Sequence, residues 1–151
     1  MTELGLQGEA REVVLAEVQA VRAHASDDEM KQRLAELVAA VDDGEIGDEP
    51  AELLESVLEL GLQTGRIRAY YGPGGEQAAL TTLRRLPRGR LRGESAADVT
   101  RALATLSGAT LDAVRINAVA PGAFTLSIEA GGVEANVRLD ATGVRLTSLG
   151  T

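Results

Sequence analysis

A dense group of arginines in the middle of the chain is the feature of the sequence best suited to binding chemistry. Clustered guanidinium groups can neutralise phosphates, and such contacts supply most of the non-specific affinity of proteins for nucleic acids. Guanidinium groups also pair with carboxylates in a planar geometry that suits Arg better than Lys. The group consists of Arg84, Arg85, Arg88, Arg90 and Arg92, and Arg66 and Arg68 extend it toward the N-terminus.

The distribution of charge favours carboxylates as the partners of these arginines. Residues 1–60 carry sixteen Asp or Glu against four Lys or Arg, whereas residues 61–151 carry seven against eleven, within a net charge of −8. The chain has only three aromatic residues and no recognisable nucleic-acid-binding motif. We therefore expect the arginines to pair with the acidic helices of the same chain or of a neighbouring subunit, in preference to nucleic acid.

Two adjacent tyrosines, Tyr70 and Tyr71, lie between the acidic and the basic regions. Exposed tyrosines often anchor protein interfaces, although packing in the core explains such residues equally well. With the arginines they complete a candidate interface of Arg66, Arg68, Tyr70, Tyr71, Arg84, Arg85, Arg88, Arg90 and Arg92.

No residue pattern indicates catalysis by a nucleophile. The chain has no cysteine, and its single histidine, His24, is expected at a helix end, where the helix dipole favours it. Ser95 lies in Gly93–Ala97, which resembles a degraded nucleophile elbow, but no base accompanies it. We interpret Ser95 as a helix N-cap together with Asp98 and predict no catalytic residue.

Metal and phosphate sites are also not expected. The acidic segment 42–49 does not match a calcium loop, because Gly44 falls where a ligand is needed, and we predict a solvated loop with Asp48 as a helix cap. Residues 72–75 lack the Lys-Ser/Thr of a phosphate-binding loop, so a plain turn is favoured. We therefore predict no metal and no cofactor.

Composition and hydropathy indicate the expected cellular location of the protein. No basic N-terminal stretch leads into an apolar run, and no apolar run approaches the roughly 20 residues that span a bilayer. We expect a cytoplasmic location. Lys31 is the only lysine, and this preference for Arg is typical of a GC-rich genome.

Helical spacing dominates the first two thirds of the chain. Apolar residues recur every three or four positions in 9–25, in a second segment that starts with a capping box at Ser26 and Glu29, and in a third segment that has Pro50 in its first turn. Gly72 to Gly75 should interrupt regular structure before a short helix that Pro87 ends. A further helix is expected from Ser95 to Leu106.

From Leu111 onward the apolar period changes to two, which predicts a four-stranded antiparallel meander with Gly131-Gly132 as a hairpin turn. The fold class is therefore α+β: N-terminal amphipathic helices followed by a helix packed on a four-stranded antiparallel β-meander. We divide the chain into an acidic helical region, a Gly/Arg-rich connecting segment with a short helix, and a helix plus meander, at residues 1–65, 66–93 and 94–151.

The segment from Gly65 to Glu76 resembles small proteins that accompany bacterial nickel-iron hydrogenases. The resemblance covers twelve residues and includes no mechanistic motif. It implies an accessory role in a larger complex.

The sequence thus favours a non-catalytic accessory, scaffold or assembly protein that acts by binding another protein or itself. This hypothesis is based on the separation of acidic and basic residues along the chain and on the lack of any pattern of reactive groups. One alternative is a small anionic-ligand-binding or regulatory module that uses the arginines. Another is nucleic-acid binding through the same cluster.

Overall fold

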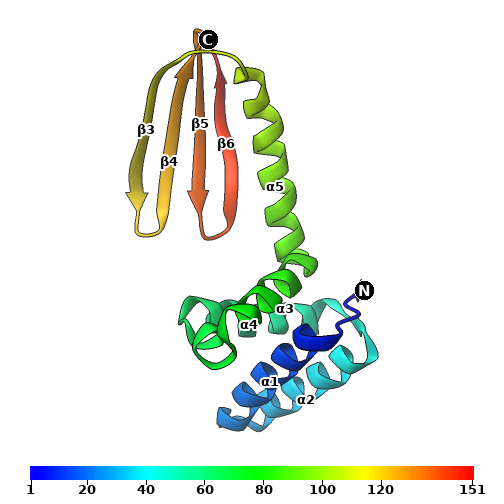
Figure 1. Cartoon of the computed structure of the whole chain (residues 1–151). Helices are drawn as coiled ribbons and strands as arrows, with labels where there is room; N and C mark the ends of the chain where they lie inside the picture. The colour runs from blue at the N-terminus through cyan, green and yellow to red at the C-terminus, as the bar shows by residue number, and fades with distance from the viewer. The chain divides into compact units, whose positions relative to one another are not determined.

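A computed structural model of the chain describes residues 1–151 and divides them into two compact units, Met1–Arg90 and Leu91–Thr151 (Figure 1). Helices precede a four-stranded antiparallel sheet, which confirms the α+β class. None of the helices is both long enough and apolar enough to cross a membrane.

The first unit is built from four helices around an aliphatic core. Its helices are α1 (Gly8–His24), α2 (Asp28–Asp43), α3 (Asp48–Gln63) and α4 (Arg66–Arg85). Leu34, Leu37, Leu54 and Leu58 are fully buried on the apolar stripes that the sequence indicates. The predicted amphipathic helices are therefore present, and their apolar sides form one core.

A small two-stranded sheet closes one end of this core. β1 (Thr2–Glu3) pairs antiparallel with β2 (Glu45–Ile46), and Leu4 and Ile46 are buried beside it. The prediction of a plain solvated loop at 42–49 was wrong, because α2 continues to Asp43 and the next residues form β2. The short strand β2 pairs only with the N-terminal residues of β1, and no pattern within residues 42–49 indicates this pairing.

Two predicted helix caps differ from those in the structure. Asp27, and not Ser26, caps α2: its carboxylate accepts hydrogen bonds from the backbone N–H groups of Glu29 and Met30. Gly47, and not Asp48, occupies the N-cap position of α3. A carboxylate one residue closer to the helix satisfies the same orphan N–H groups that Ser26 would have satisfied.

The predicted break at residues 72–75 lies inside α4. Gly72 has φ 73° and ψ −177°, so the helix is interrupted there, and Pro73 follows directly. This backbone conformation is essentially restricted to glycine. Residues 66–71 form helical turns before the break.

The last helix, α5 (Pro87–Leu103), begins well before Ser95. The predicted N-cap at Ser95 was wrong, since this residue lies in the middle of the helix. Pro87 opens α5 instead of only ending α4, as a proline in a first helical turn can do without losing a hydrogen bond. A short 3₁₀ turn at Ala104–Leu106 follows.

The predicted meander is confirmed. Its strands β3 (Leu111–Ala120), β4 (Ala123–Ala130), β5 (Val133–Asp140) and β6 (Gly143–Gly150) pair in the order of the sequence. Gly131 and Gly132 both have positive φ, as a two-residue hairpin turn of type I′ requires.

The register separates an apolar from a polar side of the sheet. One row across the four strands consists of Ile116, Leu126, Val137 and Leu146. The neighbouring row on the opposite side consists of Arg115, Ser127, Asn136 and Ser148. The period of two in the sequence thus becomes two chemically different faces.

Candidate functional site

The best-connected arginine of the predicted interface is Arg88, which binds the buried carboxylate of Glu55. Glu55 is 0% exposed and accepts hydrogen bonds from the Arg88 backbone N–H at 2.6 Å and from Nε at 2.7 Å. Because Arg88 is the second residue of α5, Glu55 also satisfies an N–H group of the first turn. The hydrogen bond to Glu55 raises the pKa of Arg88 above its ordinary value. Arg88 therefore fastens the start of α5 to α3.

A second buried carboxylate, Glu17 on α1, holds two more residues of the candidate interface. Arg66 Nε lies 3.6 Å from Glu17 Oε1, and the Tyr71 hydroxyl donates a hydrogen bond to Oε2 at 3.2 Å. Burial, and next the charge of Glu17, raise the pKa of the Tyr71 hydroxyl. Tyr71 packs against the core of the first unit, which is the packing role that the sequence left open for one of the tyrosines.

The other candidates lie nearer to solvent. Arg68 pairs with Glu76 at 3.2 Å within α4, and Arg85 Nη1 donates to the Leu4 carbonyl at 3.0 Å. Tyr70 is exposed, with the Arg66 guanidinium 5.5 Å from its ring centre. Arg84 and Arg90 are exposed and Arg92 is half-buried.

The structure thus pairs Arg66, Arg68 and Arg88 with four carboxylates of the same chain, because Arg88 contacts both Glu55 and Glu59. Contact of the candidate residues with another protein stays a prediction.

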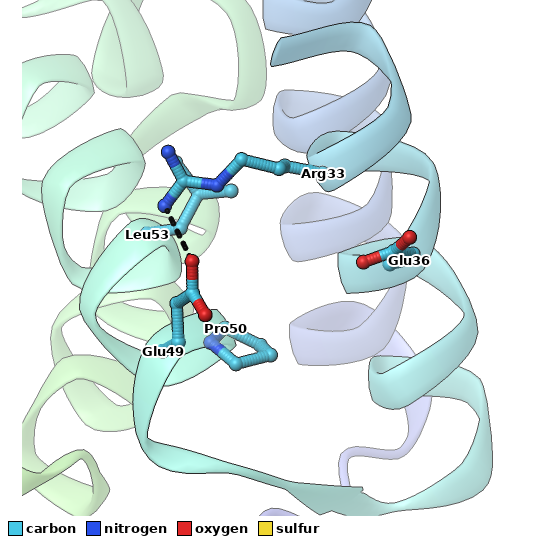
Figure 2. A pocket seen from close by; sticks show the side chains of 5 residues that line it. All are labelled: Arg33, Glu36, Glu49, Pro50 and Leu53. Carbon is cyan, nitrogen blue, oxygen red and sulfur yellow. Dashed lines mark ion pairs between the residues drawn. The ribbon is translucent and has the colours of Figure 1, made fainter. Parts of the chain in front are cut away.

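The cavities of the first unit are small or open. Figure 2 shows one between α2 and α3, where Arg33 pairs with Glu49 at 3.4 Å beside Pro50 and Leu53. Its volume of about 60 Å³ has room for about two water molecules, whereas ligand pockets have volumes of roughly 300 Å³ or more. A wider recess beside Leu4 and Gly5 is flanked by Arg85 and Arg90, and Glu3 places a carboxylate among these cations.

The isolated titratable residues singled out in the sequence do not form a cluster. His24 ends α1 as predicted, and its Nδ1 lies 2.8 Å from the Ala20 carbonyl oxygen. No three His, Asp or Glu side chains come together in a geometry that could hold a metal ion. Ser95 lies within helix α5, three residues before Asp98.

The sheet carries a feature that sequence reasoning missed. Five large apolar residues on its apolar side are between 39% and 64% exposed, and we call them the open face: Leu111, Val114, Ile116, Phe124 and Leu149. In the middle of the same side Ala135 and Val137 are buried. The apolar side is therefore covered at its centre and uncovered toward β3 and at Leu149 on β6.

Side chains on the polar side of the sheet form hydrogen bonds and an ion pair with one another. Asn136 accepts a hydrogen bond from the Ser127 hydroxyl at 2.6 Å and donates one to the Ser148 oxygen at 2.8 Å. Arg115 pairs with Glu129 at 3.7 Å. Water and neighbouring side chains can satisfy the hydrogen-bonding groups on the polar side. The open face is stabilised only by contact with other apolar groups.

Only part of the signal for the open face exists in the sequence. Alternation from Leu111 onward predicted strands with one apolar side, and a helix was expected to cover that side. How much of the sheet α5 covers depends on which of its residues are buried, and no pattern in the sequence shows this. Val99 is the only buried residue of that helix.

Comparison with protein family models, curated proteins and solved structures finds no match to the chain. The resemblance of Gly65–Glu76 to hydrogenase-associated proteins therefore rests on those twelve residues alone.

Proposed function

We propose that the protein is a non-catalytic accessory, scaffold or assembly component that binds another protein or a second copy of itself, and that the open face is its binding surface. The observation that carries this proposal is the exposure of Leu111, Val114, Ile116, Phe124 and Leu149 on one side of a sheet. Large exposed apolar side chains gathered on one side of a sheet typically mark an interaction site.

The free energy available at the open face supports a protein partner. Full burial of a large aliphatic or aromatic side chain contributes about 1.5–3 kcal/mol, so five half-exposed ones offer on the order of 5 kcal/mol. A partner that brings a similar apolar surface doubles this amount, which begins to exceed the cost of association. A small polar or anionic ligand would gain nothing from the same surface.

The arginines of the first unit support the same class of function less directly. Three of them are engaged by carboxylates of the chain, an arrangement that competes with phosphate binding. Tyr70 is exposed and adds a second possible anchor to the interaction role.

Two single variants on β3 test the proposal. Ile116→Asp places a charge on the open face, and Asn117→Asp places the same charge on the next residue, which is also exposed but points to the polar side. Stoichiometric complexes of the chain are measured by native mass spectrometry after purification under native conditions. We expect the complex to be lost with Ile116→Asp and retained with Asn117→Asp.

A chain that has a monomeric mass and no stoichiometric partner in the unaltered form contradicts the proposal. The same conclusion follows if both variants retain the complex equally, because the bound surface then lies elsewhere. Circular dichroism of both variants verifies that the sheet is intact.

A further inference from the structure

The strand that carries most of the open face is also an unpaired edge of the sheet. β3 is the first strand in the order β3-β4-β5-β6 and pairs only with β4. It is the longest strand of the sheet and contains neither proline nor lysine, so the features that protect edges are limited to Asp112, Arg115 and one irregularity near each end. One side of its backbone therefore presents N–H and C=O groups with no strand partner.

The part of this edge best suited to accept another strand is short and regular. Irregularities of pairing occur at Asp112 and again at Val119, which leaves Ala113–Ala118 in unbroken register with β4. The opposite edge differs, because β6 is irregular near Thr147 and Arg92 of α5 lies against Gly143 at its start. A regular apolar edge exists only on β3.

We infer, resting on the proposed function, that the chain binds a second copy of itself by antiparallel pairing of β3 with β3 about Ile116, which brings the β3 side chains of the two open faces into lateral contact. In this register Ile116 faces Ile116 of the second copy, and Val114 faces Ala118. Arg115 faces Asn117 on the polar side. Each pair joins residues of the same chemical class or of compatible charge.

The properties of β3 favour this register over the adjacent registers. A slide that centres the pair on Arg115 would place two guanidinium groups directly opposite each other, and like charges in such positions destabilise a strand pair. A shift of one residue in only one strand would place Arg115 opposite Ile116. Opposite residues point to the same side of a sheet, so this shift would turn the apolar side of one copy toward the polar side of the other. A slide that centres the pair on Asn117 would place Arg115 opposite Val119, where the pairing of β3 is irregular. The register centred on Ile116 avoids all three conflicts.

The charge of the second unit allows two copies to approach. Residues 91–151 carry five arginines and six acidic residues, whereas the acidic excess of the chain lies in residues 1–90. Two-fold symmetry is also the most common arrangement of homo-oligomers, and it makes the same patch serve both copies. The paired sheets would place both open faces on one side, where Val114 and Ile116 of the two copies form a continuous apolar stripe.

The absence of cysteine from the chain makes the register directly measurable, because each introduced thiol is unique. Side chains that face each other in an antiparallel pair have Cβ atoms about 4.5–5.5 Å apart, close to the spacing of a disulfide. The experiment uses the purified full chain with Ile116→Cys, Val114→Cys or Ala118→Cys and oxidised glutathione. Leu91→Cys, at a position as exposed as Ile116, is the control for random collision.

We expect Ile116→Cys to form a covalent dimer at least tenfold faster than Leu91→Cys. Val114→Cys alone should not be cross-linked, and a mixture of Val114→Cys with Ala118→Cys should give the mixed dimer. Sedimentation of the unaltered chain from about 1 to 100 µM, a range typical of small interfaces, should show reversible dimers.

Equal rates for Ile116→Cys and Leu91→Cys, or a monomer at every concentration, overturn the inference. A monomeric purified chain whose native complex is still removed by Ile116→Asp excludes the second copy and leaves the proposed function standing. A monomer with no native complex contradicts both.

Discussion

At the scale of single residues, two buried carboxylates account for much of the organisation of the arginines. Glu17 is 1% exposed and Glu55 is fully buried, and each is paired with an arginine from a later helix. A buried charge without a partner is strongly destabilising. Removal of one member of such a pair therefore lowers the stability mainly because the other charged group is left unpaired. Arg88 satisfies both Glu55 oxygens, one from the backbone and one from the side chain.

Glu55→Ala should therefore destabilise the protein far more than the loss of a surface pair. Arg88 is 40% exposed, so we expect a loss of about 3 kcal/mol, at the low end for a broken buried pair. Glu49→Ala, which removes the solvent-exposed pair with Arg33 in Figure 2, should cost no more than about 1 kcal/mol. Urea unfolding followed by circular dichroism measures both. Equal losses would mean that Glu55 has no special structural role.

The charge distribution predicts pairing between arginines and carboxylates, but it does not identify the pairs. Glu55 and Glu59 are one helical turn apart and look equivalent in the sequence. Only the packing of α3 against α4 and the start of α5 decides that Glu55 is buried. Burial is a property of the assembled helices, so no local pattern could reveal it.

At the scale of elements, glycines decide where the helices break and where they continue. Gly72 interrupts α4 with a backbone conformation that other residues avoid, while Gly93 lies within α5 without interrupting it. Gly89 has a different role, since a Cβ there would lie 1.9 Å from the Leu83 carbonyl oxygen. The close approach at this turn between α4 and α5 requires glycine.

Substitution of two glycines by alanine should have opposite effects. Gly72→Ala forces alanine into a conformation that costs on the order of 1–3 kcal/mol, so the melting temperature should fall. Gly93→Ala adds a methyl group in open space inside a helix, which should stabilise by up to about 1 kcal/mol. Differential scanning calorimetry measures both. A fall for Gly93→Ala, or no fall for Gly72→Ala, would contradict the assigned backbone roles.

The strands were predicted more accurately than the helix ends. Alternation with period two and the Gly131-Gly132 turn specify the hairpins locally, and the structure reproduces them. The start of α5 was misplaced because its first turn depends on Glu55, which is distant in the sequence. The short β1–β2 pair was missed for the same reason.

At the scale of the whole molecule, the main finding is an apolar surface that the second unit, Leu91–Thr151, leaves uncovered within itself. The sequence predicted that the meander would need a cover, and the fold class is confirmed. The structure adds that Val114, Ile116 and Phe124 lie outside this cover. A period in the sequence identifies an inner side but cannot show whether the same chain or another one buries it.

The most direct test of the binding role is carbene footprinting of the chain in native extract from its source cells. Leu60 and Leu91 serve as internal references, because their exposed fractions of 59% and 61% match the 64% of Ile116. If a partner covers the part of the open face on β3, labelling at Val114 and Ile116 should fall severalfold below the level that these references predict. Labelling of Ile116 equal to that of Leu60 and Leu91 would show that the face is bare and would contradict the proposed function.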